Sequence, residues 1–427
     1  MRYGFGLWVA VGLAMVTAAG LWQAPLGAQR GGMFMGSPDD PAIAYSTAPL
    51  SNVIDDLNKR LEAGSAALRF EGRSGYLQSV IDALELPVES QLLVFSQASL
   101  QGRLIGPSNP RAIFFNDRVF LAWVRDGDVL EAIAHDEKEG AVFYTLAQRP
   151  DGRPAFEREF RCLACHMNGD TSGVPGLLMF STTRDADGKN LRLVTTDHRS
   201  PIAERWGGWF VTASRAAANR GNQVPALATN PAAGLPSVAG LFDADGYRGA
   251  TSDIAALLAF SHQTEMVNLL TRASWEARAS DPALHPQAPG DVALVETAMR
   301  SVANEVVDYM LFVDEAPLPN PVAGGSGFTA RMSARGPRDR RGRSLYELDL
   351  NTRLLKYPCS YLVYSPAFDA LPPLAKAPIY RRLWQVLSGE VTEPRYRVLS
   401  LEDRRAVVEI LRDTKPDLPA YFTTVTK

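Results

Sequence analysis

The spacing of hydrophobic residues changes several times along the chain. Between residues 49 and 63, and again between 77 and 84, apolar side chains recur every three or four positions, which predicts amphipathic helices. Short runs rich in Val, Phe and Ile then follow at 92–95, 112–115, 119–124, 129–134 and 142–146. Turn-forming residues separate these runs, so the pattern predicts a β-meander of four or five strands.

Helical spacing returns in the second half of the chain. Two apolar runs at 177–183 and 191–196 first flank a polar turn and predict a β-hairpin. Long helical patterns then cover 253–279, 291–313, 373–387 and 401–414. The predicted fold class is therefore α+β, with N-terminal helices and a β-meander followed by a mainly helical C-terminal half.

The N-terminal segment has the features of an export signal. Arg2 precedes an apolar stretch from Leu7 to Leu21, and Leu26-Gly27-Ala28 offers a small-residue cleavage site. We therefore expect a signal peptide at 1–28 and a periplasmic protein; the alternative is an uncleaved membrane anchor. No later segment contains 18 uninterrupted apolar residues.

The remaining boundaries follow composition and pattern. Residues 29–48 are rich in Gly, Pro and Ser, which predicts a flexible leader. The helices and β-meander then occupy 49–150, a central region spans 151–250, and the helical region covers 251–427. The chain has 427 residues and a formal net charge of −3, and this near balance argues against nucleic acid as the main partner.

The central region contains the sequence Cys162-Leu163-Ala164-Cys165-His166, which matches the c-type haem attachment signature. On one helical turn the two thiols and the imidazole point the same way, so the thiols can bond the haem vinyl groups while the histidine binds iron. With 3 Cys and 5 His in the chain, a chance match is expected only about 2 times in 10,000.

Three other interpretations of the cysteine pair were weighed. A thioredoxin-like site would follow an apolar strand, whereas residues 157–161 are mainly charged. A structural zinc site needs a second ligand pair, and Cys359 stands alone in an apolar setting that favours a buried, inert thiol. A disulfide between Cys162 and Cys165 would be strained. One covalently attached haem c is the expected cofactor.

His166 is the expected proximal iron ligand, with its other ring nitrogen hydrogen-bonded to a backbone carbonyl. The distal ligand is left open between several residues. His198 is the first choice, because it directly follows a predicted strand and precedes a segment suited to holding a porphyrin. The alternatives are His262, a methionine (Met179 or Met266), or an open coordination position.

That segment reads Arg205-Trp206-Gly207-Gly208-Trp209. Trp206 and Trp209 can pack on a porphyrin or donate to a propionate, and Arg205 can pair with a propionate carboxylate. The alternative is that both tryptophans are ordinary core residues and that Arg205 has a structural role. An arginine-rich run at 331–343 is either a docking face, a propionate clamp or, as is commoner for such runs, a solvated loop.

Several segments resemble a family of exported bacterial proteins that carry a single c-type haem and have no defined activity. They are Asn-Pro-Arg-Ala-Ile-Phe-Phe-Asn-Asp at 109–117, the haem motif, 205–209, His-Gln-Thr at 262–264 and Lys-Tyr-Pro-Cys-Ser-Tyr at 356–361. The resemblance implies an exported haem protein and supplies no reaction. It also implies a fold other than the small all-helical cytochrome c fold.

Two main functions and one further alternative remain from the sequence. A single haem favours electron transfer with a redox partner protein, whereas the length of the chain favours a haem enzyme such as a peroxidase. A haem-based sensor is the third possibility. No catalytic residue is assigned, and contact with a membrane is expected only if the N-terminal segment is retained.

Overall fold

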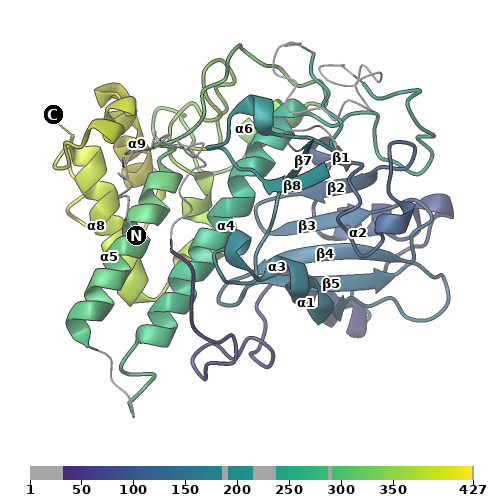
Figure 1. The fold of residues 1–427 in the computed structure, drawn as a ribbon, viewed down its shortest axis with the longest axis horizontal. Coiled ribbons are helices and arrows are strands. Elements are labelled where there is room, and N and C mark those ends of the chain that lie inside the picture. Colours follow the sequence, from purple (N-terminus) through teal and green to yellow (C-terminus); the bar gives the residue numbers. More distant parts are fainter. Residues whose placement is uncertain (1–31, 185–190, 215–236, 287–290, 426–427) are drawn as a thin grey trace, which may run out of the picture.

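The computed structural model describes residues 32–184, 191–214, 237–286 and 291–425. The expected signal peptide at 1–28 lies outside these residues. Figure 1 shows a sheet on one side of the molecule and a layer of long helices on the other. The predicted α+β class is confirmed, with most strands in the N-terminal half and the long helices in the C-terminal half.

The main sheet has six antiparallel strands in chain order: β1 (Leu92–Val94), β2 (Arg111–Phe115), β3 (Val119–Trp123), β4 (Val129–Asp136), β5 (Gly140–Ala147) and β6 (Glu157–Arg158). The first five are the predicted β-meander. The short strand β6 was not predicted, and it pairs with β5 through Thr145 and Glu157. Because β6 lies just before Cys162, it fixes the haem motif at the β5 edge of the sheet.

Two short helices pack on the first face of the sheet, namely α1 (Val53–Glu62) and α2 (Leu77–Ala83). Within residues 32–48, part of the segment expected to be a flexible leader, the side chains of Phe34, Ile43 and Tyr45 belong to the same core. Ile43 and Tyr45 are buried there, and the Tyr45 hydroxyl donates to the Ala141 carbonyl at 2.8 Å. The segment expected to be a flexible leader is thus anchored to the core by apolar side chains that lie between its Gly, Pro and Ser residues.

The second face of the sheet is partly covered by the long helix α4 (Ile254–Ser280), which Asp253 caps at its N-terminus. Most of its side chains are buried on every side, because the helix lies between the sheet and the other long helices. Phe260 of α4 packs against Phe115 and Phe120 of the sheet.

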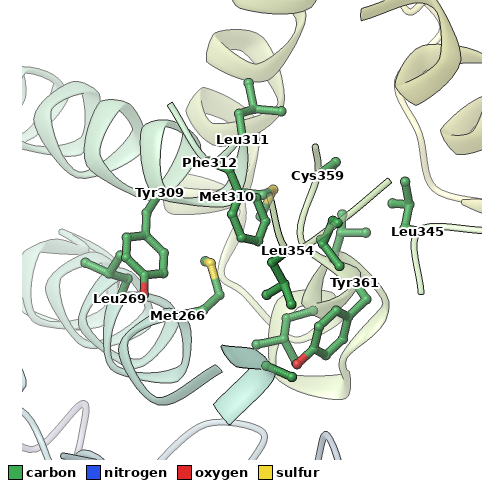
Figure 2. Close-up of a cluster of buried hydrophobic side chains, with 14 of the residues drawn as sticks. Met266, Leu269, Tyr309, Met310, Leu311, Phe312, Leu345, Leu354, Cys359 and Tyr361 are labelled. Atoms are coloured by element: carbon green, nitrogen blue, oxygen red, sulfur yellow. The ribbon is translucent and has the colours of Figure 1, made fainter. Parts of the chain in front are cut away.

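The outer helical layer consists of α5 (Val292–Met310), α8 (Pro373–Ser388) and α9 (Leu401–Thr414), with the short helices α6 (Phe328–Ser333) and α7 (Pro366–Asp369) beside them. Figure 2 shows Met266 and Leu269 of α4 meeting Tyr309 of α5 in the core between these helices. No helix among the described residues is long and apolar enough to cross a membrane.

Two further elements frame the second face of the sheet. The predicted hairpin is formed by β7 (Phe180–Arg184) and β8 (Leu191–Thr195), and its Thr182 amide donates to the Gly207 carbonyl. The neighbouring Gly208 carbonyl accepts from Phe95, just after β1, so the hairpin is tied to the β1 edge. The short helix α3 (Leu163–His166) lies at the opposite, β5 edge.

Candidate haem site

Cys162, Cys165 and His166 lie on one continuous helical turn, as the spacing predicted. A single 3-10 turn at Phe160–Cys162 runs directly into α3. The Glu159 side chain begins it by accepting from the Arg161 amide at 2.9 Å. Cys162 is half-buried and Cys165 is exposed, and both are free thiols. The disulfide alternative is therefore not what this structure shows.

The two thiols differ in their surroundings. Burial, together with the nearby charge of Glu131, raises the pKa of Cys162 to about 12, so this thiol stays protonated at neutral pH. Cys165 faces solvent and has no such cover. Of the two thiols, Cys162 is therefore the more covered and Cys165 the more accessible.

The imidazole of His166 is held in one orientation. Its Nδ1 lies 2.9 Å from the Gly176 carbonyl, which can only accept, so Nδ1 carries the proton and Nε2 presents a lone pair. The predicted hydrogen bond to a backbone carbonyl is thus confirmed. The Gly176 amide donates back to the His166 carbonyl at 2.9 Å. Burial lowers the pKa of His166, with partial compensation from Gly176, so the ring is neutral at pH 7.

Helix α4 fixes the loop that orients His166. The Asn268 Oδ1 accepts from the Leu177 amide at 2.7 Å, and its Nδ2 donates to the Leu177 carbonyl at 2.9 Å. A Cβ at position 176 would lie 2.4 Å from the Asn268 Oδ1, so only glycine fits there. On the sheet side, the Phe143 ring lies 5.0 Å from the His166 ring. None of Gly176, Phe143 and Asn268 was predicted from the sequence.

His198 lies in a different environment, with only 1% of its surface exposed. Its Nδ1 is 2.8 Å from Nδ1 of His262, and its ring stacks on those of Tyr309 and Phe312 at centroid distances of 4.0 and 4.6 Å. Its Nε2 is covered by protein atoms and has no partner among the described residues. No interaction of the described residues joins His198 to His166, so the predicted proximal and distal ligands are not brought together.

The alternative distal ligands are also engaged elsewhere. Both ring nitrogens of His262 have partners, since Nδ1 meets His198 and Nε2 lies 2.8 Å from the Ser360 hydroxyl. The Met179 sulfur accepts from the Ser261 hydroxyl at 2.9 Å and is buried. Met266 is fully buried between α4 and α5 (Figure 2). The structure therefore assigns no distal ligand.

Arg205, Trp206 and Trp209 have the structural roles of the alternative interpretation. The Arg205 guanidinium is 1% exposed and donates to the carbonyls of Ser200 and His198 at 2.8 and 2.6 Å. Trp206 is fully buried, and Trp209 donates from Nε1 to the Phe180 carbonyl at 2.7 Å. The side chains of Arg205 and Trp209 thus hold the His198 loop and the hairpin through backbone carbonyls, and Trp206 packs in the core.

The arginine-rich run at 331–343 is a surface segment held by carboxylates. Arg340 pairs with Asp413, and Arg343 pairs with both Asp339 and Glu409. The remaining pairs are Arg335 with Asp117, Arg338 with Glu347, and Arg341 with Glu409. A hollow of about 330 Å³ lies between this segment and α9, and acidic and basic side chains alternate around it. Of the three interpretations of this run, the arrangement matches a solvated surface loop whose arginines are ion-paired.

Cys359 is fully buried, as its apolar setting predicted, and burial raises the pKa of its thiol to about 12. Within the described ranges, no group of three or more His, Cys, Asp or Glu side chains is placed to hold a metal ion. A porphyrin supplies four ligands of its own, so a haem iron asks only one or two ligands of the protein. No known family model, curated protein or solved structure matches the chain.

Proposed function

We propose that the chain is an exported protein with one covalently attached haem c, and that it transfers electrons to or from a partner protein. The observation that carries this proposal is the geometry of His166. Its Nδ1–H donates to the Gly176 carbonyl, so Nε2 presents its lone pair on the same helical turn as two free thiols. Metal-binding histidines in proteins are oriented in this manner.

The residues fit a haem c in their chemistry and in their exposure. Cys162 and Cys165 would form the two thioether bonds, and His166 Nε2 would be the proximal ligand. Haem iron, when bound, supplies a one-electron couple. Because Cys165 is exposed, the part of the group bonded to it would lie within reach of a partner protein. The half-buried Cys162 and the Phe143 ring would shield the opposite side from water.

The decisive experiment is the mass of the protein produced with a cytochrome c maturation system. The expected mass is that of the polypeptide plus one haem, and the haem should resist extraction by acidified acetone. Cys162→Ala with Cys165→Ala should abolish the adduct, whereas Cys359→Ala is the matched control and should retain it. A polypeptide of apo mass, or haem that extracts freely, would refute the proposal.

The optical spectrum then separates electron transfer from the haem enzyme and the sensor. Six-coordinate, low-spin iron in both oxidation states supports electron transfer, because a closed coordination sphere leaves no position for a substrate. Five-coordinate, high-spin ferric iron that reacts with peroxide supports an enzyme instead.

Export is tested separately. N-terminal sequencing of the mature protein should begin at or near Gln29. Recovery of the full-length chain in the membrane fraction would favour the anchor.

A further inference from the structure

The second face of the sheet has a half-exposed patch beside His166. By strand register, Ile113 of β2 lies opposite Ala122 of β3, Ala122 opposite Glu131 of β4, and Glu131 opposite Thr145 of β5. Thr145 and Phe143 are two residues apart on β5, so they share a face. The His166 ring contacts Phe143. The four paired residues from Ile113 to Thr145 form a row across the sheet. The Thr145 end of this row therefore lies next to His166, the proposed proximal ligand.

Three residues of this patch are less covered than two of their neighbours on the same face. Ile113 and Phe143 are buried, whereas Ala122, Glu131 and Thr145 are each half-exposed. The hairpin β7–β8 is tied to the β1 edge and α3 to the β5 edge, so the patch lies between two flanking elements. Figure 1 shows α3 and the hairpin at different edges of the sheet. Ala122 is apolar, whereas Glu131 and Thr145 are polar, so this half-exposed row beside His166 offers a mixed surface to a group attached at that turn.

Arg111 lies at the start of β2 on this same face, two residues before Ile113. Its Nε is buried and has no partner among the described residues. Its Nη1 lies 3.4 Å from Glu131 Oε2, which is long for a charge-assisted hydrogen bond. Glu131 also accepts from the Ser99 hydroxyl at 3.1 Å and from Gln101 at 3.4 Å. Glu131 thus keeps hydrogen-bond partners without Arg111, and the Arg111 guanidinium makes fewer hydrogen bonds than its donors allow.

Both charged groups lie close enough to the proposed proximal ligand to act on it. The positive charge of Arg111 disfavours protonation of His166, and the negative charge of Glu131 favours it. A guanidinium with a long ion pair, at the edge of a half-exposed patch beside the thiols and the imidazole, matches an attached group that carries carboxylates. Haem is such a group, because its propionates are its only charged substituents.

We propose that the patch around Ala122, Glu131 and Thr145 is the seat of the haem, and that Arg111 binds a haem propionate through its terminal nitrogens. This inference rests on the proposed function and assigns to Arg111 the role that the sequence pattern gave to Arg205. Arg111 is a binding residue here. Its positive charge beside the propionate stabilises the ferrous state, which has one positive charge fewer on iron.

The experiment is an optical redox titration of the haem-loaded full chain carrying Arg111→Gln. The expected result is a change of at least tenfold in the one-electron equilibrium constant toward the ferric form, a downward shift of about 59 mV or more in midpoint potential. Glu131→Gln should shift the potential in the opposite direction. Arg111→Lys keeps the positive charge but loses the planar, two-pronged donor geometry of the guanidinium, and should give an intermediate shift in midpoint potential.

Arg300→Gln is the matched control, because Arg300 is an exposed arginine on α5 that pairs with Glu296. It should leave the potential unchanged. Equal potentials for the Arg111→Gln and Arg300→Gln proteins, with Glu131→Gln also unchanged, would overturn the assignment. That outcome is distinct from failure of the proposed function, which would appear as a chain without covalent haem. If Arg111→Gln does not fold, the opposite shift in Glu131→Gln still decides whether the haem occupies this face.

Discussion

The environments of His166 and His198 differ in what they can bind. His166 has one nitrogen bonded to a carbonyl, the other free, two thiols on the same turn and a half-exposed patch beside it. His198 has one nitrogen bonded to His262, and its free nitrogen faces packed protein atoms. Both are neutral, because burial lowers the pKa of each ring.

The difference shows that a histidine with one free nitrogen is not thereby a metal ligand. What separates the two is the space in front of that nitrogen. At His198 protein atoms cover that nitrogen, and the imidazole contributes to the core through stacking on Tyr309 and Phe312 and one hydrogen bond. At His166 the neighbouring strand positions remain half-exposed.

The largest expected effect is loss of the proximal ligand. In haem-loaded protein, His166→Ala should convert the low-spin spectrum completely to a high-spin or water-ligated one, since no other nitrogen lies on that turn. Added imidazole should restore the low-spin form by occupying the vacated space. A low-spin His166→Ala protein without added imidazole would mean that another residue is the proximal ligand.

Acid should destabilise the fold through its buried histidines. Burial lowers the pKa of His135 to about 4 and that of His262 to about 3, and it lowers the pKa of His198 as well. In the unfolded chain each titrates near pH 6.5, so the unfolded state binds more protons below that pH and the free energy of unfolding falls. The loss begins near pH 6.5 and continues toward pH 4 to 3, at about 1.4 kcal/mol per pH unit per histidine.

Urea unfolding of the haem-loaded protein at several pH values between 7.5 and 5 measures this slope. His262→Gln should reduce the slope by about 1.4 kcal/mol per pH unit below pH 6.5, because it removes one of the buried histidines that must stay neutral. A free energy of unfolding that does not change across this range would contradict the neutral, buried state of the three rings.

Arg205 offers a test of the core role against the propionate role. Arg205→Met leaves the carbonyls of His198 and Ser200 without their donor, and should lower the free energy of unfolding by about 4 kcal/mol. The midpoint potential should stay that of the unmodified protein. A lower midpoint potential with an unchanged free energy of unfolding would instead indicate that Arg205 binds a haem propionate. Chemical denaturation and redox titration of one sample give both values.

His198→Ala gives the sharpest contrast with His166. The packing predicts an unchanged haem spectrum and a loss of about 3 kcal/mol in the free energy of unfolding, from the cavity and the broken contact with His262. The assignment of His198 as distal ligand predicts a switch to high-spin iron instead. One spectrum in each oxidation state decides between them.

The local patterns predicted the elements, and the haem motif predicted its own geometry. Helix and strand periods are local, so α4, α9 and the five strands of the β-meander could be placed from spacing and turn residues alone. The contact between His198 and His262 spans 64 residues, and that between Leu177 and Asn268 spans 91. No local signal specifies such pairings. The neighbours of Arg205 in the sequence are typical of a propionate-binding segment, but its neighbours in space, which the sequence does not reveal, are those of a core residue.

The bond between Leu177 and Asn268 also has a consequence for the order of events during synthesis. The haem motif leaves the ribosome well before α4, and the 91 intervening residues take about 5 to 20 seconds to make. Until α4 emerges, the loop that carries Gly176 has no helix to dock on, and the His166 ring is free to turn. The nascent chain thus presents its two thiols and imidazole while still pliable, and the later arrival of α4 locks them in place.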